Sequence, residues 1–467
     1  MAFIRSISGV RATLGDALTP ALVADYVSAF CTYLPDGAIV LGRDGRPSGT
    51  WIEHAAVSAI LACGREARIL GMVPTPTVQL FAEEAGTAGA ISISASHNPA
   101  EYNGLKFLGG DGLFLREGQL QDMWRVVDGG TFNYVQAGGE GCVTAVANPL
   151  EVHVKRILDH ALFCAEGGAR LQRIRQRNFT VVVDAVNAAG SLAVPLLLEQ
   201  LGCNVIPLYC DGSGVFPHTP EPLPQHLGDL SRAVREHHAD LGIAVDPDAD
   251  RLVIIDNHGN AIGEENTIVL ATHAVMSAAE YFSTDQFNAR TAVVNFSTTR
   301  GVEDAAAVYG GTVHRAAVGE INVVDKMLTT RAAVGGEGSG GVIVPQIHAG
   351  RDSLVGTALL LDFLVSRRED LSGVVASLPA YAMIKQKVAY EGDPSRLFEL
   401  LETTFSSARA LHGDGIRLDF EDAWVHVRAS NTEPILRIIS EAGERSQAET
   451  LVKNVEDVMR GMSNPGS

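Results

Sequence analysis

Three short apolar runs recur along the chain, and each is followed by a stretch with helical periodicity. The runs are AIVLGRD at 38–44, TVVVDAV at 180–186 and TAVVNFS at 291–297. Their β-branched residues favour strands, and the Ala- and Leu-rich stretches that follow, such as SLAVPLLLEQLG and GVEDAAAVYGG, favour helices. The pattern therefore predicts one α/β unit that is used three times.

The spacing of these runs, roughly 110 to 140 residues, is that of domains and is too long for a solenoid repeat. We therefore expect three similar mixed α/β domains over residues 1–150, 151–255 and 256–370. Beyond them, the alternating IRLDFEDAWVHVRAS and the helical QAETLVKNVEDVM predict a smaller α+β domain over 371–467.

Charge and composition narrow the range of partners. The 467 residues carry a formal net charge of −19, which disfavours nucleic acid and anionic membranes as partners. No segment approaches the apolar length of a membrane span and no signal-like N-terminus stands out, so we expect a cytoplasmic protein. We expect it to be a monomer or a homodimer. The six cysteines show no zinc-ligand spacing. Because the net charge is negative, an anionic ligand must be held by a local group of basic residues.

The segment ISISASHNPAEYNGLKF, residues 91–107, sets an apolar run against a cluster of polar residues. Its alternation predicts a strand through Ile93, and Asn98-Pro99 predicts a turn, so Ser96 falls on the loop that leaves the strand. Such a loop can present a hydroxyl group to a ligand. Taken alone, Ser96 is equally well explained as a serine that hydrogen-bonds its own turn.

The segment LGIAVDPDADRLVIID, residues 241–256, places Asp246, Asp248 and Asp250 between two apolar strands, where the carboxylates can converge. Two such charges about 4 Å apart repel by about 4 kcal/mol at an effective dielectric of 20, so the cluster predicts a hard divalent cation. Arg251 and Asn257 stand where an EF-hand needs Gly and Glu. A helix cap or solvated turn is the remaining alternative.

Two later loops carry further polar groups. GGEGSGG at 335–341 holds Glu337 and Ser339, a carboxylate and a hydroxyl suited to neighbouring sugar hydroxyls, although a flexible loop also explains the glycines. RASNTEPILR at 428–437 combines guanidinium groups, hydroxyls and turn amides, which together suit a phosphate group. Its candidate residues are Arg428, Ser430, Asn431, Thr432 and Arg437.

Together, these segments resemble the α-D-phosphohexomutase family, the mutases of phosphoglucose, phosphomannose and phosphoglucosamine. SASHNP is similar to the phosphoserine loop of that family, DPDADR to its metal loop, GEGSG to its sugar-binding loop and RASNTEP to its phosphate-binding loop. The likeness runs in order over essentially the whole chain, with SGVR, GRDGRPSG, NGLK and VFPHTPEP as further landmarks. It implies four domains around a central cleft.

The resemblance also implies an activity. Ser96 would carry a phosphoryl group, and hexose 1-phosphate and hexose 6-phosphate would interconvert through hexose 1,6-bisphosphate, which also serves as activator. Mg²⁺ would be held by Ser96 and the three aspartates. Arg11, Lys106 and Arg251 would surround the transferring group with positive charge, and these cations would lower the pKa of Lys106 toward that of a proton carrier. His97 is a second candidate for that role.

For the sugar phosphate itself, the resemblance assigns two groups of residues. Glu337 and Ser339 would take the sugar hydroxyls that look alike after the bisphosphate turns over. The non-reacting phosphate would be held, in either orientation, by Arg428, Ser430, Asn431, Thr432 and Arg437.

The chain departs from many relatives, which have histidine where Gly341 stands and a basic residue where Glu320 stands. His348, beside Arg351, is a substitute proton carrier or a structural histidine. VGEINVV and PQIHAGRD resemble the archaeal-type phosphoglucosamine mutases, so glucosamine phosphate is the expected substrate, with Glu320 either near its ammonium group or capping a helix. The alternatives are a phosphoglucomutase/phosphomannomutase, an aspartyl-nucleophile phosphatase and a non-catalytic sugar-phosphate binding protein.

Overall fold

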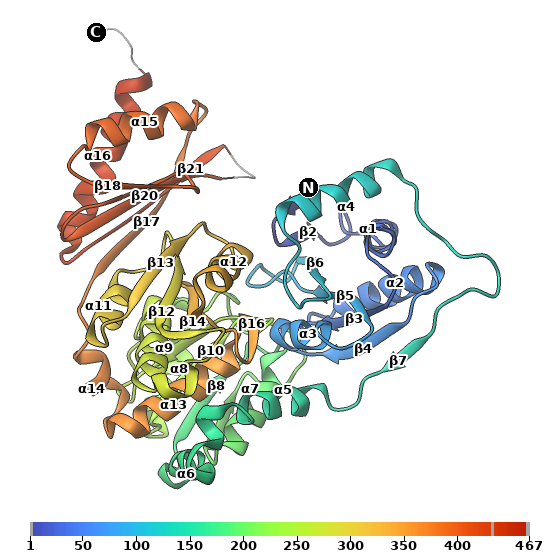
Figure 1. Cartoon of the computed structure of the whole chain (residues 1–467), viewed down its shortest axis with the longest axis horizontal. Helices are drawn as coiled ribbons and strands as arrows, with labels where there is room; N and C mark the ends of the chain where they lie inside the picture. Colours follow the sequence, from blue (N-terminus) through green and yellow to red (C-terminus); the bar gives the residue numbers. More distant parts are fainter. Residues whose placement is uncertain (1–2, 431–433, 464–467) are drawn as a thin grey trace.

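A computed structural model describes residues 3–430 and 434–463, and within these ranges the chain forms four β-sheets with helices packed against them (Figure 1). The first three sheets are mixed and the fourth is antiparallel. This confirms the predicted fold class of three similar α/β domains followed by an α+β domain. We refer to them as domains I to IV.

The sheet of domain I has the order β1-β2-β6-β5-β3-β4-β7. Its strands are β1 (Phe3–Ser6), β2 (Gly9–Thr13), β3 (Ala38–Arg43), β4 (Ala67–Met72), β5 (Thr87–Ile93), β6 (Tyr102–Gly109) and β7 (Val143–Ala145). Its helices are α1 (Pro20–Tyr33), α2 (Gly49–Ala62), α3 (Thr75–Ala82) and α4 (Glu117–Gly129). The run predicted at 38–44 forms β3, and the strand predicted through Ile93 forms β5.

Domains II and III have sheets in the orders β11-β10-β8-β9 and β13-β12-β14-β15-β16. The strands are β8 (Thr180–Asp184), β9 (Asn204–Leu208), β10 (Leu241–Val245), β11 (Leu252–Ile255), β12 (Asn288–Asn295), β13 (Thr312–Ala316), β14 (Ala332–Glu337), β15 (Gly341–Val344) and β16 (His348–Arg351). The other two predicted runs therefore form β8 and β12.

The helices of this middle part of the chain surround both sheets. They are α5 (Pro149–Leu158), α6 (Ala161–Arg177), α7 (Gly190–Gln200), α8 (Gly228–Glu236), α9 (Glu265–Ser277), α10 (Ala279–Phe282), α11 (Gly301–Val308), α12 (Glu320–Thr330), α13 (Ser353–Arg367) and α14 (Leu371–Ala376), with a 3₁₀ turn at Pro224–His226. Helix α6 is interrupted by non-helical residues at 165–168.

One four-strand motif recurs in the first three sheets. A central strand pairs in parallel with two neighbours, and the second of these continues into an antiparallel hairpin: β4-β3-β5-β6, β9-β8-β10-β11 and β13-β12-β14-β15. This confirms the α/β unit that is used three times. Ser96, the three aspartates and Glu337 all lie on or beside the hairpin loop of their own domain. The repeated topology therefore places three chemically different loops at equivalent positions.

Domains II and III share one hydrophobic core, and domain I has a core of its own together with a smaller cluster that it shares with domain III. Helix α13 of domain III packs against α6 and α7 of domain II as well as against α9. The chain between domains I and II is also anchored, because β7 pairs with β4 and α5 packs between α3 and α7. Domains II and III thus form a single packing unit beneath the hairpin loops.

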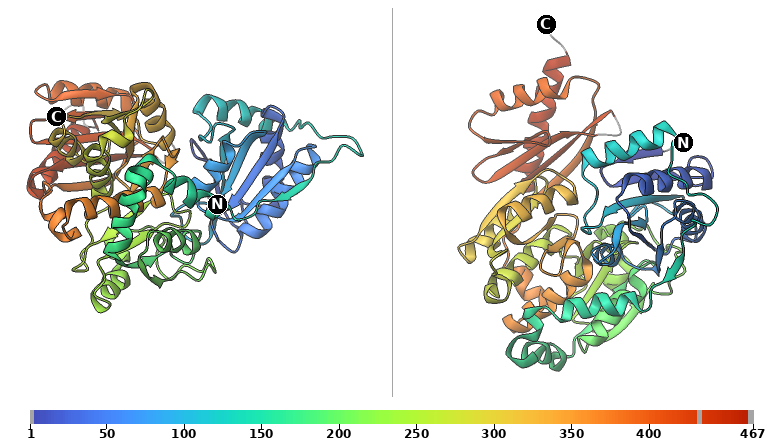
Figure 2. Two further views of the ribbon diagram at one scale, coloured as in Figure 1. Left: turned by 60° about the horizontal axis from the view of Figure 1, so that its bottom comes forward. Right: turned by 45° about the vertical axis from the view of Figure 1, so that its right-hand side comes forward.

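Domain IV is a five-stranded antiparallel sheet in the order β17-β21-β20-β19-β18. Its elements are β17 (Ala382–Ala389), α15 (Pro394–Thr404), β18 (Arg409–His412), β19 (Ile416–Asp419), β20 (Ala423–Ala429), β21 (Ile435–Ala442) and α16 (Arg445–Ser463). It stands above domain III in Figure 1 and in the right-hand view of Figure 2. Hydrogen bonds join them, including Ser297 Oγ to His426 Nδ1 (2.9 Å) and Val318 N to Asp414 Oδ2 (3.0 Å).

None of the described helices is both long and apolar enough to cross a membrane.

The shared core predicts that domains II and III lose stability together. We expect Leu197→Ala, on α7, to cost about 2–5 kcal/mol because it opens a cavity among fully buried side chains. Hydrogen exchange should then show faster opening of both β8 and β12, with β20 of domain IV little changed, because the core of domain IV is separate. Leu192→Ala is the matched control on the same helix, since Leu192 is 58% exposed. Loss of protection confined to β8 would contradict the shared core.

Candidate active site

Ser96 lies on the loop between β5 and β6, in the left-handed backbone conformation, with φ of 51°. A non-glycine residue in this conformation needs support from its surroundings. Ser94 Oγ accepts a hydrogen bond from the Ser96 amide (2.8 Å), and the guanidinium of Arg46 donates to the carbonyl oxygens of Ser96 (2.7 Å) and Asn98 (2.5 Å). Arg46 is itself buried and paired with Asp44. The Ser96 hydroxyl is therefore presented by a loop held from beneath.

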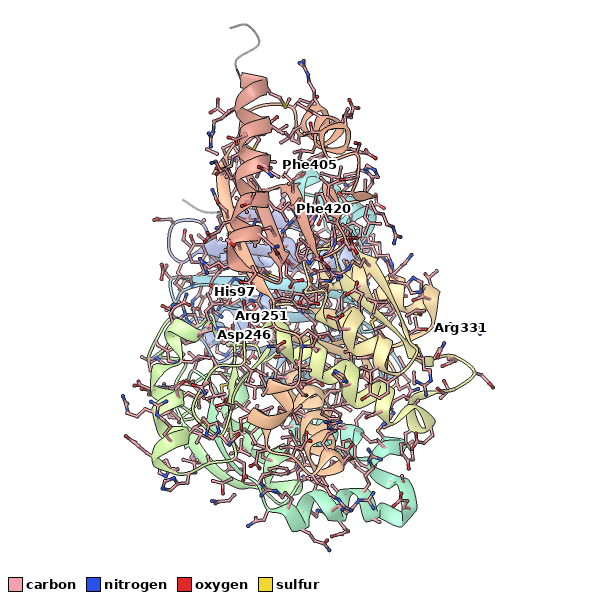
Figure 3. The ribbon with its side chains drawn as sticks, turned by 90° about the vertical axis from the view of Figure 1, so that its left-hand side faces the viewer. His97, Asp246, Arg251, Arg331, Phe405 and Phe420 are labelled. Carbon is pink, nitrogen blue, oxygen red and sulfur yellow. The ribbon has the colours of Figure 1, made fainter. Side chains whose placement is uncertain are left out.

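The hydroxyl reaches across to domain II. Ser96 Oγ donates to Asp246 Oδ2 at 2.9 Å and lies 3.4 Å from His97 Nδ1. The Ser96 hydroxyl therefore does more than hydrogen-bond its own turn. Figure 3 shows His97, Arg251 and Asp246 gathered below domain IV. Two loops that are 150 residues apart in sequence meet at this hydroxyl.

Asp246, Asp248 and Asp250 are all fully buried, and their ligand oxygens lie within 4.8 Å of one another. Burial and repulsion from the other two carboxylates raise the pKa of Asp246 well above its usual value. Oδ1 of Asp248 and Oδ1 of Asp250 are buried and have no hydrogen-bond partner within the described part of the chain. Buried carboxylate oxygens without a hydrogen-bond partner fit a divalent cation.

Lys106, on β6, lies inside this cluster, with Nζ 2.5 Å from Asp248 Oδ2 and 3.5 Å from Asp250 Oδ2. Burial lowers the pKa of Lys106, but the two carboxylates outweigh it, and the net shift is upward. The lowering expected from the sequence is therefore wrong, because carboxylates and not only cations surround the amine. On Asp248, burial raises the pKa, and Lys106 and Thr75 outweigh it, so that the pKa falls.

Further basic groups stand around the cluster. Arg251 Nε lies 3.8 Å from both Asp246 Oδ2 and Asp250 Oδ1. Burial lowers the pKa of Arg11. The charge of Asp248 raises this pKa and the charge of Arg251 lowers it further. Burial, with repulsion from Arg251 and Arg11, lowers the pKa of His97 to about 2, so its imidazole is neutral at neutral pH.

Arg351, to which the sequence assigned no role, joins three carboxylates. Its guanidinium lies 2.7 Å from Asp250 Oδ2, 2.9 Å from Glu320 Oε2 and 2.8 Å from Glu337 Oε2. Its aliphatic stem covers Gly341, where an added Cβ would lie 2.4 Å from Arg351 Cδ. The glycine therefore makes room for the arginine, in the space that a histidine side chain at residue 341 would need.

Both glutamates of this network are engaged. Glu337, at the end of β14, accepts from Asn295 Nδ2 (2.9 Å) and the Gly319 amide (3.0 Å). Burial raises its pKa, but Arg351 and these donors outweigh it and lower the pKa. Glu320 begins α12 and accepts from Gln79 Nε2 (2.9 Å), and burial raises its pKa. Ser339 lies half-buried in the turn between β14 and β15.

The fourth loop joins β20 to β21, and Asn431 and Thr432 lie outside the described residues. Arg428 stands directly opposite Arg437, which in turn stands opposite Lys387 on β17. Opposed residues share a face of the sheet, and like charges there are destabilising without an anion. Ser430 precedes the undescribed part of the loop, and its amide donates to the Ile435 carbonyl (2.9 Å).

These three residues form a basic row, Lys387–Arg437–Arg428, on the face of the sheet away from α15 and α16. Leu436 and Ile438, the neighbours of Arg437, pack into the core with those helices, so Arg437 points the other way. Arg428 Nη1 lies 3.8 Å from Asp414 Oδ1, and Asp414 Oδ2 accepts from the Val318 amide, which places this end of the row near domain III. Lys387 was missed because its membership depends on strand register, which its own sequence neighbourhood does not signal.

Comparisons with known proteins match this chain to one family along nearly its whole length. It matches the phosphoglucomutase/phosphomannomutase alpha/beta/alpha domains I, II and III over residues 4–133, 161–259 and 271–381, and the C-terminal domain of that family over 383–458. It is 31% identical to a probable phosphoglucosamine mutase of Methanopyrus kandleri, over 97% of each chain. It is 32% identical to a phosphoglucomutase/phosphomannomutase of Thermococcus kodakarensis, over 97% of this chain and 98% of the relative.

Among solved structures, the chain resembles a phosphoglucomutase/phosphomannomutase family protein of Burkholderia thailandensis. The TM-score is 0.83 at 25% identity, and 99% of each chain is covered.

The raised pKa of Asp246 predicts that protons compete with a divalent cation. We expect the affinity for Mg²⁺, measured by calorimetry, to rise as the pH rises through the folded pKa of Asp246, by at most about tenfold per pH unit for one released proton. Without metal, the folded chain holds this proton more tightly than the unfolded chain, so stability falls as the pH rises through the folded pKa. Asp246→Asn should weaken Mg²⁺ binding, whereas the exposed control Asp211→Asn should not. An affinity independent of pH would contradict this reading.

Proposed function

The chain belongs to the phosphoglucomutase/phosphomannomutase family, and we propose that it interconverts hexose 1-phosphate and hexose 6-phosphate through a phosphoryl group carried on Ser96. The observation that carries this proposal is the 2.9 Å hydrogen bond from Ser96 Oγ to Asp246 Oδ2. It puts a supported hydroxyl at the edge of a buried carboxylate cluster that fits a divalent cation, where hairpin loops of two α/β domains meet.

The reaction has two mirror-image halves. In the first, the bond between phosphorus and Ser96 Oγ breaks and a bond from phosphorus to the free sugar hydroxyl oxygen forms, while the hydroxyl proton passes to a base. The product is hexose 1,6-bisphosphate. After the bisphosphate turns over, Ser96 Oγ takes the other phosphoryl group and the leaving sugar oxygen recovers a proton. Asp246, Asp248 and Asp250 would hold Mg²⁺, which would neutralise the charge on the transferring group.

The chain's own residues divide the remaining work. His97 lies close to Ser96 Oγ, but its lowered pKa makes the imidazole a weak base, so it can hydrogen-bond the hydroxyl but is poorly suited to take its proton. Lys106 stays charged and holds Asp248 in place. Arg11 and Arg251 add positive charge beside the transferring group. Arg351 is a positioning residue, because its guanidinium fixes Asp250 and Glu337 relative to each other.

The far end of the substrate is held by domain IV and domain III. The basic row, with Ser430, Asn431 and Thr432 of the same loop, binds the non-reacting phosphate in either orientation. Glu337 and Ser339 take the neighbouring sugar hydroxyls. Since Arg428 lies near Asp414, which accepts from the Val318 amide of domain III, one ligand can reach both groups of residues.

Replacing Ser96 tests the phosphoryl carrier. We expect Ser96→Ala to lose mutase activity by at least about a thousandfold, because the variant lacks the hydroxyl that the β5–β6 loop presents to Asp246. Intact-mass and peptide analysis should find one phosphoryl group on Ser96 in the wild-type chain and none in the variant. The exposed Ser58→Ala is the control.

The same experiment separates the competing functions. An aspartyl-nucleophile phosphatase would tolerate Ser96→Ala and fail with Asp246→Asn or Asp248→Asn. A non-catalytic binding protein would bind sugar phosphate without isomerising it. Full mutase activity in Ser96→Ala would refute the proposed mechanism.

The basic row predicts a binding role for a residue outside the sequence motifs. We expect Lys387→Gln to raise KM about tenfold, equivalent to about 1.4 kcal/mol, with a smaller effect on kcat, because Lys387 adds charge for the phosphate without touching the reacting atoms. Increasing salt should reduce the difference. Lys453→Gln, an exposed lysine on α16, is the matched control. Equal KM values for Lys387→Gln and the wild type would remove Lys387 from the site.

Glucosamine phosphate is the proposed substrate, supported by relatives such as the probable phosphoglucosamine mutases of Methanopyrus kandleri and Pyrococcus horikoshii. Glucose and mannose phosphates are the alternative, favoured by the Thermococcus kodakarensis relative. Glu320 is paired with Arg351, so we expect it to influence which sugar phosphate is preferred through the position of that arginine.

We expect kcat/KM for glucosamine 6-phosphate to equal or exceed the values for glucose and mannose 6-phosphates, each measured with a trace of the matching bisphosphate. A preference of about tenfold or more for glucose or mannose, about 1.4 kcal/mol in transition-state binding, would reverse the substrate assignment and leave the mutase class intact.

A further inference from the structure

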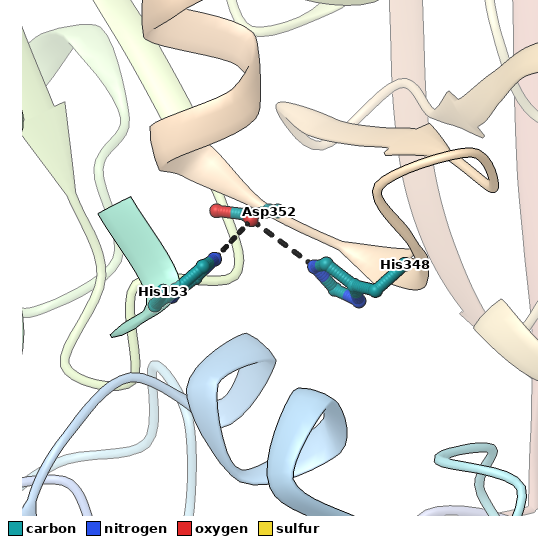
Figure 4. Close-up of side chains that lie close together, drawn as sticks. All are labelled: His153, His348 and Asp352. Carbon is teal, nitrogen blue, oxygen red and sulfur yellow. Dashed lines mark hydrogen bonds and ion pairs between the residues drawn. The ribbon is translucent and has the colours of Figure 1, made fainter. Parts of the chain in front are cut away.

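A second cluster of metal-ligating side chains lies outside the active site, within the part of the chain that the structure describes. It consists of His153 on α5, His348 on β16 and Asp352 at the N-terminus of α13 (Figure 4). Nε2 of His153 lies 2.8 Å from Asp352 Oδ2, and Nε2 of His348 lies 3.1 Å from the same oxygen. None of the three is more than 2% exposed. Two imidazoles from distant segments thus converge on one carboxylate oxygen.

The groups behind the cluster orient two of its members. Nδ1 of His153 lies 2.9 Å from Thr77 Oγ1, and Asp352 Oδ1 accepts from the Leu354 amide at 2.8 Å. Partners of this kind fix the ring orientation of metal-bound histidines and the position of ligating carboxylates. Nδ1 of His348, by contrast, is buried without a hydrogen-bond partner among the described residues. This nitrogen is not the one that faces Asp352, so the proposed ion would bind His348 through Nε2 and would leave Nδ1 as it is.

The spacing suits a small tetrahedral ion. With metal–ligand bonds of about 2.0–2.1 Å, neighbouring ligand atoms of a tetrahedral zinc site lie roughly 3.3 Å apart. The two measured separations, 2.8 Å and 3.1 Å, are a few tenths of an ångström shorter. A small outward movement of the two rings would therefore admit an ion at bonding distance from all three atoms.

We propose that His153, His348 and Asp352 bind Zn²⁺ at a site separate from the three aspartates. The ligand types divide the two sites between two metals. Imidazole nitrogens favour zinc and similar transition ions, whereas the all-oxygen cluster of Asp246, Asp248 and Asp250 favours Mg²⁺. With three protein ligands, the fourth tetrahedral position would be left to a water molecule. Because the three ligands are buried and none of them touches the active-site hydroxyl, the site supports the fold and not the phosphoryl transfer.

The location gives the ion a role at the domain junction. It ties α5, in the segment between the first two sheets, to the β16–α13 corner of domain III, and Thr77 adds α3 of domain I. Arg351, the residue before Asp352, contacts Asp250 and Glu337. The ion therefore fixes the backbone from which the active-site guanidinium projects.

Metal content tests the proposal directly. The full chain, produced with zinc supplied, is dialysed against buffer that contains Mg²⁺ but no zinc, and its metals are measured by mass spectrometry. We expect one zinc per chain in addition to any Mg²⁺. Removing zinc with a chelator should lower Tm by at least about 4 °C, and adding zinc should restore it. Replacement by Co²⁺ should give the visible absorption of a tetrahedral site. A wild-type chain that retains no zinc and shows no zinc-dependent Tm would overturn the proposal.

Variants locate the ion. His153→Gln and His348→Gln should each lose the bound zinc and the zinc-dependent part of Tm. Two other variants should keep one zinc: Asp246→Asn, which alters only the magnesium cluster, and His273→Gln, a half-buried histidine that contacts Tyr309 and Phe363. If the cluster is only hydrogen-bonded, the His153 and His348 variants lower Tm equally with and without zinc. That result, or zinc retained in both variants, would refute the site.

Discussion

Buried negative charge is the constraint on which the rest of this structure depends. Asp246, Asp248 and Asp250 have no exposed surface, and their oxygens lie within 4.8 Å of one another. Such a cluster exists only where cations offset the repulsion, and removal of one partner from a buried ion pair typically costs about 3–5 kcal/mol. Lys106 from domain I and Arg351 from domain III both contact Asp250. The carboxylates of one loop in domain II thus form ion pairs with cations from domains I and III, so three domains meet at this site.

The repeated topology explains why those domains can meet there. Each α/β domain ends its parallel strands in a hairpin, and each hairpin carries a different function: a hydroxyl, three carboxylates, or a carboxylate beside a glycine-rich turn. Three copies of one fold therefore supply three unlike groups to a common site. Domain IV adds the basic row from a sheet of another kind, on the face that its helices leave uncovered.

The parts of the structure that the sequence predicts are those fixed by local chemistry. The runs that form β3, β8 and β12 are short, apolar and β-branched, and the loops with Ser96 and the three aspartates are bounded by clear strand signals. Partners that depend on tertiary contact or register escaped prediction. Nothing in the sequence Gly-Arg-Asp distinguishes Arg351, because its place in the site depends on the packing of its side chain over Gly341. Lys387 belongs to the basic row only through its pairing with Arg437. The lowered pKa expected for Lys106 failed for the same reason, because the carboxylates beside it come from another domain.

The central claim is that one ligand spans the loops of all four domains. A crystal structure of Ser96→Ala with hexose 1,6-bisphosphate and Mg²⁺ tests it most directly. The account predicts one phosphate beside residue 96 and the three aspartates, the other on Arg428, Arg437 and Lys387, and the sugar hydroxyls on Glu337 and Ser339. A bisphosphate bound with both phosphates away from the basic row, or away from the aspartate loop, would contradict it.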